Sequence, residues 1–398
     1  MKTVAIIAEY NPFHKGHEYQ IKKIREEFGL DTRVVAIMSG NYVQRGEVAF
    51  ADKFTRAECA VRCGVNLVLE LPFPFSSSSA EFFARAGVKI AAQIPSIDYL
   101  SFGSECGDTE QLSRIAKNML DPRFVSALKN SVGGKNAPTV KSLFSIYNSI
   151  FGEELDESFF SSNNILAIEY IKAIYDLNLK IEPHTVKRLG ADYNEENIIE
   201  NSLQSASAIR AAIYSKDETA LEYMPKNAKD VLLSEYGNYP ADIERIAPAI
   251  ISSFRINTPN AKIHDAEGGL YNRLKRESFK VDKIQNLISR ADTKKYTSAR
   301  IRRAVLNSFF GVTSSIVRSL PQYTQVLALD SVGGTILKEA KKTTQLSILT
   351  KPSKTSNLTE TALLQKELSD RADSIYQLTL PSFRDGNASI TKSPFIMK

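Results

Sequence analysis

The amino-acid sequence predicts an α/β protein, in which a doubly wound parallel sheet is followed by a mainly helical C-terminal region with a small βαβ unit. Two observations lead to this fold. Apolar runs typical of buried strands alternate strictly with amphipathic, helix-like segments over the first 110 residues, and this alternation implies right-handed crossovers between parallel strands. From about Pro225 the pattern changes to helices, so we expect a sheet-containing domain over residues 1–224 and a helical domain over residues 225–398.

Each expected strand of the first region is a short apolar run, and each expected helix carries apolar residues on one face. The expected strands are residues 3–10, 33–40, 65–72 and 97–103. The expected helices are residues 18–28, 52–64 and 76–94. Asp52 marks the start of the second helix and Gly64 its end, and a serine is available as the N-cap of the third.

The rest of the chain continues the alternation and then departs from it. Residues 107–178 are expected to be mostly helical, residues 180–190 to return to the sheet as a strand, and residues 205–214 to open another helix. The expected helices and strands of the C-terminal region are helices 242–256 and 298–310, then strand 324–330, helix 335–342 and strand 345–350. The last three form the predicted βαβ unit.

Two of the four histidines, His14 and His17, lie three residues apart between the first expected strand and the first expected helix. Ligands of a parallel sheet bind beyond the carboxyl ends of its strands, and a helix N-terminus favours anions. Gly16 keeps side-chain bulk away where a phosphate would approach the backbone. Imidazoles can donate hydrogen bonds to phosphate oxygens as charge builds up in nucleotidyl transfer. We therefore expect a phosphate site here; the alternative is an ordinary polar loop.

Two further segments are expected at the same edge of the sheet. Ser205, Ser207 and Arg210 stand at the start of the helix after the last strand of the first region, where hydroxyls and a guanidinium suit the β- and γ-phosphates of a nucleotide. Lys187 and Arg188 end the preceding strand. The alternatives are a serine N-cap with a solvated arginine, and a surface basic pair. The agreement of three segments favours a nucleotide site.

Signals of several other protein classes are missing. The chain has no GxxxxGK[ST] run and no GxGxxG fingerprint, which argues against a P-loop enzyme and a dinucleotide redox enzyme. Its three cysteines are too few for a disulfide framework and lack zinc-finger partners, so we expect buried thiols and no metal site. No apolar run approaches the roughly 20 residues of a membrane span, and no signal peptide precedes the first strand. We expect a cytoplasmic protein without a membrane partner.

Positive charge is concentrated in one segment. Residues 261–310 carry twelve Lys or Arg against five Asp or Glu, a net charge of +7. The whole chain has a net charge of +6, so the remaining residues are near neutral at −1. The expected helix 298–310 places Ile301, Val305 and Phe309 on one core-facing stripe. The basic residues largely outside that stripe or just before it are Lys294, Lys295, Arg300, Arg302 and Arg303. Such a surface suits a phosphate-rich partner, and the alternative is a solvated helix face.

The histidine motif with the S-x-S-x-x-R helix start resembles the HIGH-type nucleotidyltransferase superfamily. More specifically, "AEYNPFHKGH", "MSGNYVQRGE", "ADKFTRAECAVRCGVNLVLELPF", "FGSE", "NNILAIEY" and "SASAIR" closely resemble segments of the bacterial tRNA(Met) cytidine acetate ligase family, in that family's order, over roughly residues 1–215. The C-terminal part resembles the family more loosely. Lys15 is one departure, since the family more often has Asn there; it is the variable position of the motif.

The resemblance implies a reaction and a set of site residues. Acetate attacks the α-phosphate of ATP, pyrophosphate leaves, and the acetyl-adenylate passes its acetyl group to N4 of the wobble cytidine of elongator tRNA(Met). The catalytic residues are expected to be His14, His17, Ser205 and Arg210. The ATP-binding residues implied by the family are Ile7, Ala8, Glu9, Tyr10, Asn11, Pro12, Phe13, His14, Lys15, Gly16, His17, Glu18, Tyr19, Gln20, Gly103, Asn163 and Arg188.

ATP also implies Mg²⁺, although the sequence shows no carboxylate cluster for it. Without the family, Gly103 would be taken as a turn glycine and Asn163 as a helix N-cap. Two other functions share the motifs: a small-molecule adenylyltransferase of the pantetheine-phosphate or nicotinamide-mononucleotide type, and an RNA-binding protein with a vestigial nucleotide site. The first usually needs little more than the α/β domain, and the second does not explain why both histidines, the serines and Arg210 are present. The ligase is therefore the favoured prediction, with tRNA bound by the basic segment.

Overall fold

The structure is a computed structural model of the chain. It describes residues 1–132, 140–153, 155, 157–188, 204–236, 240–258, 262–293 and 295–398.

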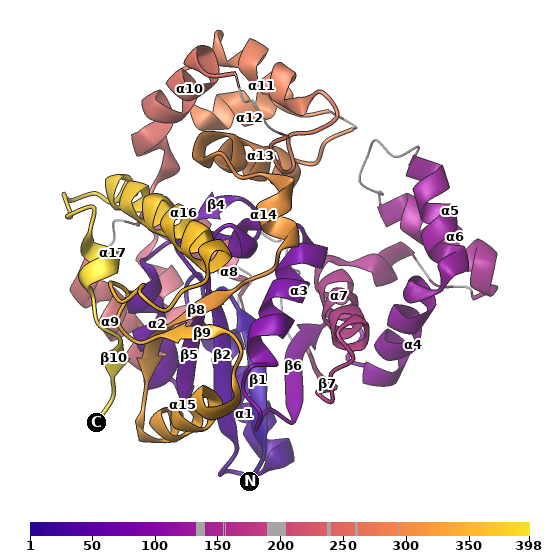
Figure 1. Cartoon of the computed structure of the whole chain (residues 1–398), viewed down its shortest axis with the longest axis vertical. Helices are drawn as coiled ribbons and strands as arrows, with labels where there is room; N and C mark the ends of the chain where they lie inside the picture. The colour runs from indigo at the N-terminus through magenta and orange to yellow at the C-terminus, as the bar shows by residue number, and fades with distance from the viewer. Residues whose placement is uncertain are drawn as a thin grey trace.

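An eight-stranded sheet forms the centre of the described part of the molecule (Figure 1). The strands run in the order β10, β8, β5, β2, β1, β6, β7, with β9 beside β8. Their bounds are β1 (Thr3–Ala8), β2 (Arg33–Ser39), β5 (Leu67–Leu71), β6 (Tyr99–Ser104), β7 (Glu182–Lys187), β8 (Tyr323–Leu329), β9 (Ser347–Leu349) and β10 (Phe395–Ile396). Every pair in this sheet is parallel except β5 with β8. The predicted α/β class and its strands are confirmed.

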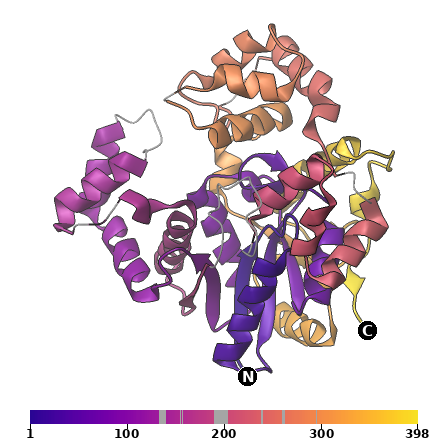
Figure 2. The same ribbon diagram turned by 180° about the vertical axis from the view of Figure 1, so that it is seen from behind.

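Helices cover both faces of the sheet because strand side chains alternate in direction. Val4 and Ile6 of β1 face a core shared with α1, α2 and α8, whereas Ala5 and Ile7 face a core shared with α3, α4, α7 and α15. The bounds of these helices are α1 (Lys15–Phe28), α2 (Lys53–Arg62), α3 (Ala80–Ala91), α4 (Thr109–Leu120), α7 (Ser162–Asp176), α8 (Ala206–Tyr214) and α15 (Ser331–Thr343). Viewed from behind, the indigo α1 lies over the first of these faces (Figure 2).

The first helix differs from the prediction at its start. It begins at Lys15 instead of residue 18, because His14 acts as its N-cap through its side chain. His17 therefore lies in the first turn of the helix and not in a loop before it.

Two groups of helices extend from the sheet. The helices α5 (Pro122–Val132) and α6 (Val140–Phe151) project beyond α4 on one side (Figure 1). The group at the top of that view has a hydrophobic core of its own, and it consists of α10 (Ala247–Ile256), α11 (Leu270–Ser278), α12 (Ile284–Ala291) and α13 (Ser298–Phe310). The remaining helices are α9 (Lys226–Tyr236), α14 (Ser314–Arg318), α16 (Glu360–Tyr376) and α17 (Ala388–Thr391).

The predicted βαβ unit forms, since β9 pairs in parallel with β8 after α15. It is not a small separate sheet, however, because β8 also pairs antiparallel with β5. The C-terminal residues therefore return to the N-terminal sheet. A division of the chain after residue 224 stays a prediction.

A buried group of charges fixes this return. The Lys53 ammonium on α2 donates to Glu70 on β5 at 2.8 Å and to Asp373 on α16 at 2.6 Å, and all three side chains are at most 3% exposed. Asn41 joins the group by donating to Asp373. Removing one partner would leave an uncompensated buried charge, so these ion pairs tie α16 to α2 and β5.

The strand order reverses direction between β1 and β6. From β1 the chain builds outward through β2 and β5, then returns to the other side of β1 for β6 and β7. Ligands of open parallel sheets bind beyond the carboxyl ends of the strands at such a point. The loop after β1 and the end of β6 are therefore the expected place of a site.

Candidate active site

The loop after β1 holds the two histidines in a capping arrangement. His14 Nδ1 accepts a hydrogen bond from the Gly16 N–H at 3.0 Å, and His17 Nδ1 accepts one from the His14 N–H at 3.2 Å. The two rings lie 3.8 Å apart between centroids, with Tyr10 against His17 at 4.9 Å. Because each Nδ1 accepts a hydrogen bond, each neutral ring carries its proton on Nε2. The pair is a double hydrogen-bond donor.

Burial keeps both rings neutral. Burial, together with the charges of Arg188 and Arg210, lowers the pKa of His14 to about 3. Burial, then His14 and Arg188, lowers the pKa of His17 well below its ordinary value. The site therefore offers N–H dipoles without a positive charge on the rings at neutral pH.

Gly16 has a more local reason than the one the sequence suggested. A Cβ added there would lie 2.7 Å from Cε1 and 2.9 Å from Nδ1 of His14. Any side chain would displace the imidazole from its capping position. The glycine makes the histidine arrangement possible, whatever else it does for a ligand.

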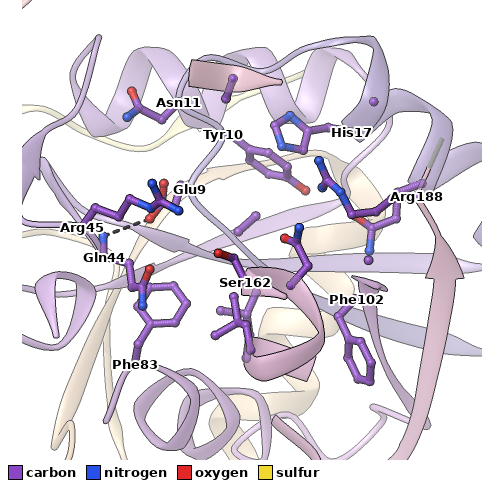
Figure 3. Close-up of a pocket in the computed structure, with 18 of the residues that line it drawn as sticks. Glu9, Tyr10, Asn11, His17, Gln44, Arg45, Phe83, Phe102, Ser162 and Arg188 are labelled. Atoms are coloured by element: carbon purple, nitrogen blue, oxygen red, sulfur yellow. Dashed lines mark hydrogen bonds between the residues drawn. The ribbon is translucent and has the colours of Figure 1, made fainter. Parts of the chain in front are cut away.

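A cavity of about 540 Å³ opens in front of these rings. Its walls come from the ends of β1, β6 and β7, the starts of α3, α7, α8 and α13, and the β3 (Tyr42–Val43) to β4 (Glu47–Val48) hairpin. Figure 3 shows His17 and Arg188 on one side of the cavity and Glu9 with Arg45 on the other. Pockets of roughly 300–1,000 Å³ suit cofactor-sized ligands.

Most of the residues implied for ATP line this cavity. Those that do are Ile7, Ala8, Glu9, Tyr10, Asn11, His14, Gly16, His17, Tyr19, Gln20, Gly103, Asn163 and Arg188. Pro12, Phe13, Lys15 and Glu18 are not among the lining residues. The structure thus brings together segments that are more than 150 residues apart in the sequence.

Gly103 of β6 lies close to the side chain of Arg188, which directly follows β7. The Arg188 N–H donates to the Ser104 carbonyl at 3.0 Å, which continues the β6–β7 pairing by one residue. A Cβ at Gly103 would lie 3.3 Å from Arg188 Cγ, tighter than an ordinary contact. Gly103 therefore leaves room for the stem of Arg188, whose charge is felt at His14 and His17.

Asn163 is held in the cavity by Glu105 of the "FGSE" segment. Its Nδ2 donates to Glu105 Oε1 at 2.6 Å, while Glu105 Oε2 accepts from Ser161 Oγ at 2.6 Å and from the Asn164 N–H at 2.9 Å. Burial opposes ionisation, but these hydrogen bonds outweigh it and lower the pKa of Glu105. The carboxylate fixes the first turn of α7 against the end of β6.

Arg210 and Ser205 are placed differently relative to the cavity. Arg210 lines the cavity and donates to the Asn11 carbonyl at 2.8 Å and to Glu47 at 3.3 Å. Ser205 is 2% exposed and is absent from the lining; its Oγ caps α8 by accepting the Ala208 N–H. The Ser205 hydroxyl thus forms the serine N-cap that the sequence offered as the alternative, and a contact between Ser205 and a phosphate stays a prediction.

Four of the five residues expected to bind tRNA are described by the structure, and each of the four contacts another group of the protein. Arg303 is 8% exposed, pairs with Asp265 at 2.7 Å and lines the cavity. Arg302 pairs with Glu47 at 3.4 Å, and Arg300 donates to the Asp265 carbonyl at 3.1 Å. Lys295 is exposed and donates to the Gly268 carbonyl at 3.0 Å. Lys294 lies outside the described residues.

Several lining residues gave no clear sequence signal. They are Gln44 and Arg45 of the hairpin, the aromatic residues Phe83, Phe102 and Tyr170, and Thr297, Ala299 and Arg303 of the helical group. Gln44, Arg45, Phe102 and Tyr170 lie in the segments "MSGNYVQRGE", "FGSE" and "NNILAIEY" that resemble the family, but periodicity could not place their side chains in the cavity. Gln44 donates its backbone N–H to Glu9 at 2.9 Å (Figure 3).

Glu9 is the acidic side chain among the described residues lining the cavity. Burial raises its pKa, while the Gln44 N–H and the Arg210 charge lower it. Within the described ranges, no three His, Cys, Asp or Glu side chains gather as metal ligands. The lining therefore suits a cation held mainly by a polyphosphate and water, with one carboxylate in support.

None of the described helices is long and apolar enough to cross a membrane.

Comparison with known proteins gives the class that this fold and site define. A family model described as HIGH Nucleotidyl Transferase matches residues 1–389. That match spans the histidine loop, the cavity and the helical group. The chain is a HIGH-type nucleotidyltransferase.

The comparisons also give the family within that class. A tRNA(Met) cytidine acetate ligase of Clostridium perfringens is 34% identical over 100% of both chains, and one of Caldanaerobacter subterraneus is 36% identical over 96% of both. A crystal structure of Thermotoga maritima TmcAL bound with alpha-thio ATP has a TM-score of 0.89 at 29% identity, covering 100% of both chains. The chain belongs to the tRNA(Met) cytidine acetate ligase family.

Proposed function

We propose that this chain activates acetate as acetyl-adenylate with ATP and transfers the acetyl group to N4 of the wobble cytidine of elongator tRNA(Met). One observation carries the proposal: two neutral imidazole donors and two arginines, Arg188 and Arg210, meet in one cavity at the switch point of the sheet. The family match over the whole chain, including the helical group, favours this function over a small-molecule adenylyltransferase.

The residues of the cavity have separate tasks in the first half-reaction. An acetate oxygen attacks the α-phosphorus, its bond to phosphorus forms, and the bond to pyrophosphate breaks. Negative charge grows on the phosphate oxygens, where fixed N–H donors in a dry site are most effective. The Nε2–H groups of His14 and His17 supply such donors, and Arg188 and Arg210 hold the phosphates in place.

Neutral imidazoles suit this role. A protonated ring would bind ground-state ATP and the transition state alike by its full charge, whereas oriented N–H dipoles respond to where charge develops. The rings stay neutral because they are buried and because positively charged arginines lie nearby. No covalent enzyme intermediate is needed, because AMP is the leaving group of the second half-reaction.

We also propose that Mg²⁺ enters with ATP. Glu9 would support it, directly or through water, and the ion would neutralise charge on the leaving pyrophosphate. The raised pKa of Glu9 reflects a buried carboxylate that a nearby cation would favour in its ionised form.

The test examines the carboxylic acid and the tRNA acceptor in separate measurements. ATP–pyrophosphate exchange is measured with acetate, propionate and butyrate, each with and without bulk tRNA, and the tRNA is then digested and analysed for N4-acetylcytidine by mass spectrometry. We expect exchange with acetate above the other acids, and acetylcytidine in elongator tRNA(Met). Exchange without any tRNA product, or a small-molecule adenylate as the end product, would contradict the proposal.

A further inference from the structure

A second cavity, of about 350 Å³, adjoins the first. Its walls come from the β3–β4 hairpin, α8, the 3₁₀ turn Ile243–Ile246, α12 and α13. Arg45 and Arg210 line both cavities. Since Arg210 donates to Asn11 on one side and to Glu47 on the other, its guanidinium stands where the two cavities meet.

The walls of this second cavity combine an aromatic platform with apolar packing. Tyr214 is 50% exposed, yet its hydroxyl donates to the Ala241 carbonyl at 2.6 Å, which restricts the ring. Ile243, Ile288 and Val305 add apolar surface. A flat ring beside apolar side chains is the arrangement on which unpaired bases stack, with roughly 1–3 kcal/mol per base.

The three carboxylates of the second cavity differ in the groups that they contact. Asp242 Oδ1 accepts the Glu244 N–H, and the Glu244 oxygens accept the N–H groups of Ile284 and Gln285. Those two carboxylates cap helix starts. Glu47 instead is held by side chains, Arg210 at 3.3 Å and Arg302 at 3.4 Å, and a carboxylate has about four lone-pair sites to offer. Glu47 therefore keeps acceptor capacity toward the cavity.

We infer that the second cavity receives the acceptor nucleoside, a cytidine base turned out of an RNA loop, with its ring on Tyr214 and its exocyclic amine toward Glu47. The inference rests on the proposed function. Enzymes that modify a base take it out of its stack into such a pocket, and unpaired loop bases are recognised through stacking and their base edges. A carboxylate accepts from the amine of cytosine but repels the carbonyl oxygen that uracil has at that position.

Arg45 and Arg210, which line both cavities, lie between the proposed base and the reacting phosphate. The amine nitrogen forms a bond to the acetyl carbon of acetyl-adenylate, the carbon–oxygen bond to AMP breaks with its electron pair on AMP, and the amine proton is released to water. The amine must therefore approach the phosphate end of the first cavity, near His14 and Arg210. A base seated in the second cavity reaches that end past Arg210, which lines both cavities.

Filling the second cavity tests the inference. Ala211 is exposed on α8 and lines the second cavity but not the first. We expect Ala211→Trp to lower acetyl transfer to tRNA by about 10-fold or more, while acetate-dependent ATP–pyrophosphate exchange stays within about 2-fold. Affinity for tRNA should change by less than about 3-fold, because phosphate contacts dominate it.

Ser215→Trp is the matched control, since Ser215 is exposed one turn farther along and lines neither cavity; its transfer rate should equal that of the wild type. Normal transfer by Ala211→Trp, or a loss of transfer fully matched by a loss of tRNA affinity, would overturn the inference.

A second pair of variants asks whether the ring of Tyr214 matters. Tyr214→Ala removes the platform and should lower transfer about 10-fold, whereas Tyr214→Phe keeps it and should transfer within about 2-fold of the wild type. Equal rates for the two variants would overturn the assignment of Tyr214. If the wild-type protein supports exchange but never acetylates tRNA, the proposed function itself fails, and the inference fails with it.

Discussion

At the scale of single residues, the two histidines act as a unit set by backbone hydrogen bonds. His14 caps α1 through Nδ1, so a variant must keep the cap if it is to report on chemistry. Asparagine is among the best N-cap residues, and its shorter side chain does not reach where the imidazole Nε2–H points.

We expect His14→Asn to lower the rate of acetate-dependent ATP–pyrophosphate exchange by about 100-fold, because one donor to the developing charge is lost. The affinity for ATP should weaken much less. Lys15→Ala is the control, since Lys15 is exposed beside His14 and does not line the cavity. An His14→Asn enzyme with near-normal exchange would remove His14 from the catalytic residues.

The same histidine predicts a pH dependence of stability. Its pKa is about 3 in the folded protein and about 6.5 in an unfolded chain, so the unfolded state binds more protons between these values. The free energy of unfolding should therefore fall as the pH drops below about 6.5, by up to about 1.4 kcal/mol per pH unit. Urea unfolding without ATP at pH 7.5 and 5.5 measures this, and His14→Asn should show a smaller fall; equal falls would contradict a neutral, buried His14.

At the scale of elements, one arginine on α2 joins the ends of two strands to the loop before the helix. Arg56 is 1% exposed. Its guanidinium donates to the carbonyls of Ala51 at 2.8 Å, Glu9 at 2.6 Å and Ser39 at 3.1 Å, and to that of Gly40. Only a planar fork with five donors can satisfy these groups together.

Arg56→Lys should lower the free energy of unfolding by about 3 kcal/mol, since several buried carbonyls lose their donors. It should also weaken ATP binding, because the Glu9 carbonyl is part of the loop after β1. Urea unfolding and ATP titration measure the two effects. Arg62→Lys on the same helix is the control, as Arg62 forms an exposed pair with Glu58 and should change stability by no more than about 0.5 kcal/mol. If Arg56→Lys lowered the free energy of unfolding no more than Arg62→Lys, the hydrogen bonds of Arg56 would not stabilise the fold.

At the scale of the whole molecule, the helical group contributes both to the ATP cavity and to the predicted binding of tRNA. Thr297, Ala299 and Arg303 of this group line the cavity, so removing the charge of Arg303 would disturb both functions at once. Lys295 and Arg300 are the better reporters, because neither lines the first cavity.

We expect Lys295→Ala with Arg300→Ala to weaken tRNA binding and to reduce the slope of log affinity against log salt by about one per lost phosphate contact. ATP–pyrophosphate exchange should be unchanged. Lys341→Ala with Lys342→Ala is the matched control, because these exposed lysines lie on α15 at the opposite end of the molecule (Figure 1). If both double variants keep the wild-type salt slope, tRNA lies on another surface.

Local chemistry made part of this protein predictable from its sequence. The strands and the amphipathic helices follow from side-chain periodicity, which each segment carries by itself. The site loop follows from a short motif between a strand and a helix, where the carboxyl edge of a parallel sheet must lie. Even so, the sequence placed the start of α1 too late, because a histidine N-cap is not a common capping signal.

Only the tertiary structure decided how distant segments meet. The pairing of β8 with β5, which are more than 250 residues apart, leaves no periodic signal in either strand. The burial of Arg303 depends on its ion pair with Asp265, which lies 38 residues away in the chain. The charge of an arginine can be read from a sequence, but its exposure is set by the neighbours that folding brings, and for Arg303 that neighbour is distant in the chain.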